Sequence, residues 1–142
     1  MSDESVVAAY DAAGGSVATQ VANLLVDAEF TNVFTQSLSA AVCPEPIVVL
    51  VGSYDRDSEQ VGAERGERVL DVIVCREVNA VAEAVSLACE QALRTAEWDT
   101  RAGAYLNRIT GIDTDAPEFR GRDGSGRYLW DFKVYVTIAR PS

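Results

Sequence analysis

The closing segment of the chain constrains its fold more than any other feature, because large apolar side chains recur there at every second position. One set of alternate residues is aromatic or aliphatic: Tyr128, Trp130, Phe132, Val134, Val136 and Ile138. The residues between them are more polar: Leu129, Asp131, Lys133, Tyr135 and Thr137. A period of two matches the alternation of side chains across a strand and leaves little room for a helix. The segment therefore predicts a long β-strand with one apolar face.

Four other segments also have the character of strands. Residues 47–51 are five consecutive aliphatics, too few for a helix and rich in β-branched side chains. Residues 68–77 contain a similar run, which indicates burial on both faces near the middle of a sheet. Residues 105–113 alternate like a strand with one solvated face, and a short strand is expected within 34–40.

Two amphipathic helices separate these strands. The first is expected to begin after Ser16, a good N-cap, with an apolar stripe formed by Val17, Val21, Leu24, Leu25 and Ala28. The second is expected to begin after Asn79 and to end near Trp98, with a stripe formed by Val81, Val85, Ala88, Cys89, Ala92 and Leu93. Glu90 and Arg94 have the i,i+4 spacing of a surface ion pair.

The order α-β-β-β-α-β-β predicts an α+β fold: a mostly antiparallel sheet of four to five strands with two main helices packed on one face. A chain of 142 residues is the usual size of one domain, and nothing in it marks a linker. We therefore expect a single domain over residues 16–142, preceded by a lead-in at residues 1–15. The three cysteines lie in or beside apolar runs, which favours reduced core thiols.

The net charge of −10 restricts the partners of the chain. Residues 1–60 carry nine carboxylates and a single basic residue, Arg56. Such a surface repels phosphate backbones, so we expect no specific nucleic-acid binding. The acidic start of the sequence lacks the basic region of a signal peptide, and no apolar run reaches membrane-spanning length. We therefore expect no membrane partner and a cytosolic location.

The sequence contains no histidine, which removes the commonest general base and metal ligand, and its only lysine is Lys133. We therefore predict that the chain is not an enzyme and needs no cofactor or metal. A cation-dependent enzyme or sensor is an alternative, because Asp113, Asp115, Glu118 and Asp123 lie close together in sequence. The glycines that follow Asp123 favour a plain solvated connection between two strands instead.

Two charged segments are candidates for protein–protein contacts. Residues 53–67 hold little that could be buried and predict an exposed loop, in which Arg56, Asp57, Glu59 and Arg65 are candidate interaction residues. The second candidate is a basic patch made by Arg120, Arg122, Arg127 and Tyr128. Arginine beside tyrosine is enriched at protein interfaces. A bacterial adaptor domain that binds a partner through residues 53–67 is a further alternative.

The run from Asp123 to Ile138, preceded by a strand, a helix and a strand, resembles the tail terminator (tail-completion) and minor tail proteins of long-tailed bacteriophages. The resemblance extends over most of residues 16–140. It implies a prophage-encoded structural protein that forms a ring, commonly a hexamer, at the end of the tail tube. Its expected partners are other copies of itself, the tail tube protein and the head–tail connector proteins. It would lie in the host cytoplasm during assembly and then in the virion tail.

Overall fold

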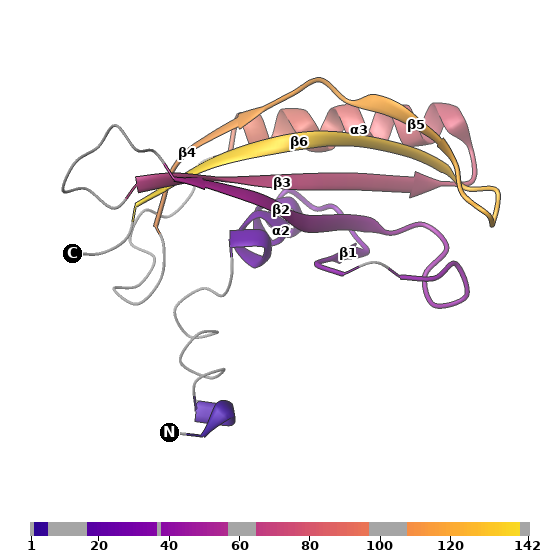
Figure 1. The fold of residues 1–142 in the computed structure, drawn as a ribbon. Helices are drawn as coiled ribbons and strands as arrows, with labels where there is room; N and C mark the ends of the chain where they lie inside the picture. The colour runs from indigo at the N-terminus through magenta and orange to yellow at the C-terminus, as the bar shows by residue number, and fades with distance from the viewer. Residues whose placement is uncertain (1, 6–16, 37, 57–64, 97–107, 140–142) are drawn as a thin grey trace.

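The protein folds into a single sheet with its helices on one face (Figure 1). The structure is a computed structural model that describes residues 2–5, 17–36, 38–56, 65–96 and 108–139. In chain order its elements are α2 (Val17–Asp27), β1 (Val33–Phe34), β2 (Ile47–Arg56), β3 (Arg65–Arg76), α3 (Asn79–Arg94), β4 (Arg108–Thr114), β5 (Glu118–Arg122) and β6 (Tyr128–Ala139). Residues 3–5 form a helical turn. The predicted α+β class is confirmed.

The strands follow the order β1-β2-β3-β6-β4, and β5 also pairs with β6. Only the pairing of β1 with β2 is parallel among these strands. One side of β6 is occupied by β3 over its whole length. Its other side is shared by β4, which pairs with residues 134–139, and β5, which pairs with residues 128–131. The sheet therefore ends in β1 and β2 at one edge and in β4 and β5 at the other.

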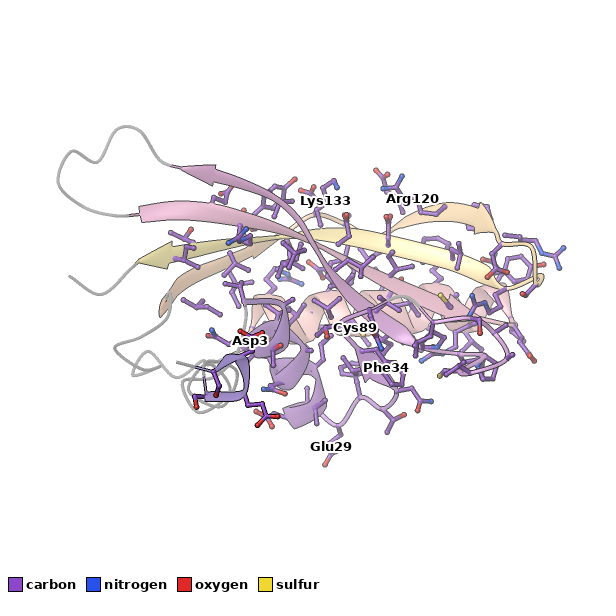
Figure 2. The ribbon with its side chains drawn as sticks, turned by 60° about the horizontal axis from the view of Figure 1, so that its bottom comes forward. Asp3, Glu29, Phe34, Cys89, Arg120 and Lys133 are labelled. Carbon is purple, nitrogen blue, oxygen red and sulfur yellow. The ribbon has the colours of Figure 1, made fainter. Side chains whose placement is uncertain are left out.

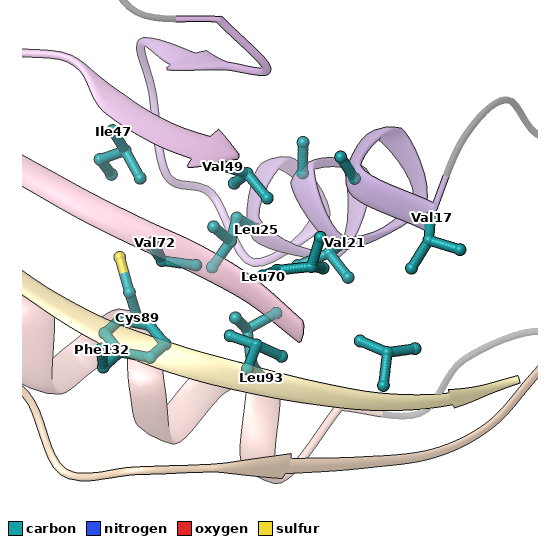
Figure 3. Packing of buried hydrophobic residues seen from close by; sticks show 14 of the residues in the cluster. Val17, Val21, Leu25, Ile47, Val49, Leu70, Val72, Cys89, Leu93 and Phe132 are labelled. Atoms are coloured by element: carbon teal, nitrogen blue, oxygen red, sulfur yellow. The ribbon is translucent and has the colours of Figure 1, made fainter. Parts of the chain in front are cut away.

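The core lies between the sheet and the two helices (Figure 3). Leu70, Val72 and Val74 of β3 are fully buried there. Their partners on β6 belong to the predicted apolar face, of which four residues are buried: Phe132, Val134, Val136 and Ile138. Both helices supply residues to the same cluster, including Val21, Leu25, Cys89 and Leu93. The prediction of helices on one face is thus confirmed.

The predicted apolar stripe agrees with the buried residues better in α2 than in α3. In α2 the buried residues include Val17, Val21 and Leu25, as the spacing predicts, whereas Ala28 lies past the end of the helix. In α3 the buried stripe is Ala82, Ser86, Cys89 and Leu93. Of the predicted stripe, Cys89 and Leu93 are buried as expected, whereas Val81 and Ala88 are exposed. Apolarity alone could not orient this helix, since Ser86 is buried with its hydroxyl donating to the Glu83 carbonyl oxygen at 2.8 Å.

The predicted ends of α3 are also corrected. Val78 precedes the first turn, and Asn79 is the first helical residue instead of the cap. The Asn79 Oδ1 atom accepts a hydrogen bond from Trp130 Nε1 at 2.8 Å, so this side chain joins the helix to β6. The helix ends at Arg94, and Thr95 donates its backbone N–H to the Gln91 carbonyl oxygen. Trp98 lies outside the described residues, as does Ser16.

Three strand predictions need correction. The strand expected within 34–40 is the two-residue β1, because residues 38–46 form turns and Pro44 and Pro46 have no N–H to pair. The loop expected at 53–67 is shorter, because β2 continues to Arg56 and β3 begins at Arg65. β5, which makes six strands instead of four or five, was not predicted. The facing ends of β2 and β3 and the whole of β5 are held by backbone pairing, which leaves no apolar pattern in the sequence.

The central position of β3 is confirmed, but its burial on both faces is not. The face toward the helices is buried, whereas Val69, Asp71 and Ile73 on the other face are partly exposed. Two ion pairs lie on this outer face: Lys133 Nζ to Asp71 Oδ1 at 2.9 Å, and Arg120 Nε to Asp131 Oδ2 at 2.6 Å. The outer face is therefore a mixed surface, and the dry core lies on the helix side.

Candidate functional site

The turn between β5 and β6 is built around Asp123. Its Oδ1 accepts the backbone N–H groups of Ser125 and Arg127 at 3.0 and 2.9 Å, and its Oδ2 accepts Nε of Arg127 at 2.6 Å. Burial raises the pKa of this carboxyl, but the bonds from Arg127 and Ser125 outweigh it and hold the pKa below its ordinary value. The Arg127 side chain also donates to the carbonyl oxygen of Cys43 at 3.3 Å. Arg127 thus has a structural role in joining two turns.

Aromatic side chains cover the helix-facing side of β5 and the start of β6. The ring centroid of Phe119 lies 6.4 Å from that of Tyr128 and 5.8 Å from that of Trp130. The Arg122 guanidinium carbon lies 4.8 Å from the centroid of the Tyr128 ring, a cation–π geometry. Phe119 is nevertheless half exposed. The edge of the sheet therefore presents an aromatic and an arginine to solvent, side-chain types that are enriched in protein interfaces.

The predicted basic patch is not brought together as one surface. Arg122 and Tyr128 lie on the helix-facing side of the sheet, as their register and ring contact show. Arg120 pairs on the outer face with Asp131, a largely buried carboxylate, and this contact raises the pKa of the guanidinium. Arg127 is mostly buried against Asp123. Two of the four predicted residues, Arg122 and Tyr128, therefore remain together in one accessible surface.

The structure describes two of the four predicted residues of the 53–67 segment. Arg56 pairs with Gly66 across the β2–β3 hairpin, and Arg65 pairs with Ala139 of β6. Their backbone positions therefore lie in strands. Asp57 and Glu59 lie outside the described residues.

The acidic residues of the cation alternative are dispersed by the strands. Asp123 holds the turn, the Asp115 Oδ2 atom accepts the hydroxyl of Tyr135 at 2.8 Å, and Asp113 Oδ1 accepts the backbone N–H of Thr114. The contact with Asp115 is the main reason that the pKa of Tyr135 is raised. Within the described ranges, no three acidic or cysteine side chains come together in a way that could hold a metal ion.

Sequence reasoning missed the exposed apolar residues of α3 and β5. Leu87 is 48% exposed, Val78 56% and Phe119 50%. A signal was available for Phe119, an aromatic residue set among the charged residues of 118–122. No such signal was present for Leu87, because the residues of the buried stripe of α3 are no more apolar than Leu87 itself.

No protein-family model and no curated protein matches the sequence. Among solved structures, the chain is similar to one from the virion of a native gene transfer agent particle, with a TM-score of 0.58. The sequences are 17% identical, and the likeness covers 87% of this chain and 95% of that one. The two chains share a fold over nearly their whole lengths. In the part of the chain that the structure describes, no helix is both long and apolar enough to cross a membrane.

Proposed function

We propose that this chain is a structural virion assembly protein, a prophage tail terminator or minor tail protein that forms a ring at the end of the tail tube and contributes to head–tail joining. The likeness of its fold to a virion chain, over 87% of its length, carries the proposal. Its partners would be copies of itself, the tail tube protein and head–tail connector proteins. Assembly would take place in the host cytoplasm, before the ring becomes part of the virion tail.

The open edges of the sheet support this function. β1 pairs with only Ile47 and Val48 of the ten-residue β2, and β5 pairs with β6 on one of its two sides. Strand edges with unpaired N–H and C=O groups are able to pair with another chain. A ring needs a contact surface on each of two sides of its subunit. The acidity of the chain fits a lumen through which DNA passes without being retained.

Electron microscopy of tail tubes tests the function directly. Purified tubes of the same prophage are mixed with the protein, and rings are expected at one end of each tube. In the prophage itself, deletion of the gene should give tails of unregulated length and few head-joined particles, and the wild-type gene supplied in trans should restore both. Tubes that stay uncapped in the presence of the protein would rule the function out, whether the protein is monomeric or associated.

A further inference from the structure

The exposed large apolar side chains of the described residues fall into two groups. One group belongs to α2, the segment before β2, and β2 itself: Val26, Val42 and Val51. The other belongs to α3, the residue before it, and β5: Val78, Val81, Leu87 and Phe119. Since β2 and β5 lie at opposite ends of the strand order, Val26 and Val51 lie at the edge opposite to Phe119. Val42 lies near the β5–β6 turn instead, because Arg127 of that turn donates to the carbonyl oxygen of the neighbouring Cys43. Figure 2 shows Glu29, which follows α2, on the side of the molecule away from Arg120 and Lys133, which lie on the outer face of the sheet.

The exposed side of α3 is unusually apolar for a surface helix. Its buried stripe already contains Ala82, Cys89 and Leu93, yet Val81 and Leu87 on the other side are 43% and 48% exposed. The exposed residues around them are mostly small or uncharged, namely Ala80, Ala84, Ala88 and Gln91, and Glu83 is also exposed. A helix that is apolar on both sides is normally covered on both sides. This surface joins the aromatic one through the hydrogen bond of Trp130 to the first residue of α3.

The two edges differ in charge as well. From residue 17 to residue 55 the chain contains four carboxylates, Asp27, Glu29, Glu45 and Asp55, and no lysine or arginine. At the other edge, the exposed Arg94 and Arg122 are accompanied by the carboxylates of Glu83 and Glu90. Two copies that met through the first edge alone would oppose carboxylates with carboxylates, which is unfavourable. Contact between unlike edges avoids this and places Arg122 against an acidic surface.

We propose that the α3 edge (Val78, Val81, Leu87, Phe119 and Arg122) binds the α2 edge (Val26, Asp27, Glu29 and Val51) of a second copy of this chain. Two unlike surfaces make a head-to-tail contact, which generates a closed ring or an open chain of subunits instead of a symmetric dimer. The assignment of this contact to a ring rests on the proposed function. The two edges are the surfaces through which neighbouring subunits would meet.

Complementation between two edge variants tests this contact. Val26→Asp disables the α2 edge, and Leu87→Asp disables the α3 edge; both side chains are half exposed, so neither change enters the core. Each variant and their equimolar mixture are studied by sedimentation velocity over a concentration series. Ser5→Asp is the matched control, since it adds the same charge at an exposed residue outside both edges. Circular dichroism establishes that every variant folds.

The wild type and Ser5→Asp are expected to form species larger than a dimer. Each edge variant alone should be monomeric, with self-association weakened by at least about tenfold. The mixture should form a dimer of twice 15.3 kDa and nothing larger, because one intact edge of each kind remains. A monomeric mixture, or dimerisation of either variant alone, would overturn the head-to-tail contact.

The outcomes for the contact and for the function can be told apart. A wild-type protein that stays monomeric at every concentration but caps tail tubes overturns this contact and leaves the proposed function standing. A protein that associates through the two edges but leaves the tubes uncapped supports this contact and overturns the proposed function. Charge reversal adds a second measurement: Asp27→Arg and Arg122→Glu should each weaken association, and the mixture of the two should regain part of it.

Discussion

Cys89 is a residue whose ionisation is coupled to folding. It is fully buried on α3 beside Phe132, and burial raises the pKa of its thiol to about 12 from the ordinary 9.0, against the smaller opposing effect of the Arg76 charge (Figure 3). The unfolded chain loses this proton near its ordinary pKa, whereas the folded chain keeps it. The contribution of the thiol to stability is therefore complete below about pH 9 and is lost as the pH rises toward about 12.

We predict that the free energy of unfolding falls with pH over this range, by on the order of 1.4 kcal/mol per pH unit from this group. Cys89→Ala should remove that part of the slope while adding a pH-independent loss of packing. Urea denaturation of both proteins under reducing conditions, between about pH 8 and about pH 11, measures the difference. Other titrating groups are common to both, so parallel profiles would contradict the prediction.

At the residue scale, the local sequence predicted which side chains are buried better than it predicted which residues they contact. All three cysteines are buried and unpaired, as their apolar surroundings indicated. The ion pair between Glu90 and Arg94 is also present, at 3.0 Å, because both residues lie on one helix. The partner of Asn79 could not be predicted, since Trp130 is 51 positions away and the two meet only after the helix has packed on the sheet.

Among the elements, β5 depends most on its backbone conformation. Gly121 has a φ of +103° at the irregular pairing between Phe119 and Gly121, and a Cβ added there would meet nothing within 4 Å. The cost of a side chain at this position is therefore one of backbone strain. We predict that Gly121→Ala destabilises the fold by about 1–2 kcal/mol and increases hydrogen exchange in β5.

Gly124→Ala provides the matched control, because that glycine also has open space around it and does not require a positive φ. It should leave stability within about 0.5 kcal/mol of the wild type. Urea unfolding and amide hydrogen exchange of the two variants measure the contrast. Equal effects at the two glycines would show that the conformation of Gly121 is unimportant to the strand.

The elements that could be predicted are those whose side chains enter the core. β6, the core run of β3 and the start of β2 all carry a regular apolar pattern, and all three form the strands that the pattern indicates. β5 has only Phe119 as a large apolar residue, so its pairing with β6 is invisible in the pattern. Residues 54–56 extend β2 by pairing with residues 66–68 of β3, which the apolar pattern did not indicate.

The whole molecule has one core that both helices and the sheet share. Leu25 of α2 is fully buried in the same cluster as Leu93 of α3 and Val134 of β6. We predict that Leu25→Ala destabilises the protein by about 2–5 kcal/mol, since the cavity would lie between the two layers. Far-UV circular dichroism and tryptophan fluorescence should report the same shift, because helix and sheet lose stability together.

Leu87→Ala is the matched control on the other helix. The Leu87 side chain is about half exposed, so its loss should change stability of the isolated chain by no more than about 0.5 kcal/mol. Thermal or urea unfolding of the two variants gives the comparison. Separate transitions for the two probes in Leu25→Ala would mean that α2 unfolds independently of the sheet.

The one-sided placement of the helices has a consequence for how this chain can change over evolutionary time. Even-numbered positions of β6 face the core, whereas Asp131, Lys133 and Tyr135 lie on the outer face. Drift can therefore exchange the odd positions more easily, provided that the ion pair of Asp131 with Arg120 is kept or replaced, while the even ones must keep their bulk. Distant descendants of such a strand would keep its alternation of bulky and polar positions long after most of its residues had been replaced.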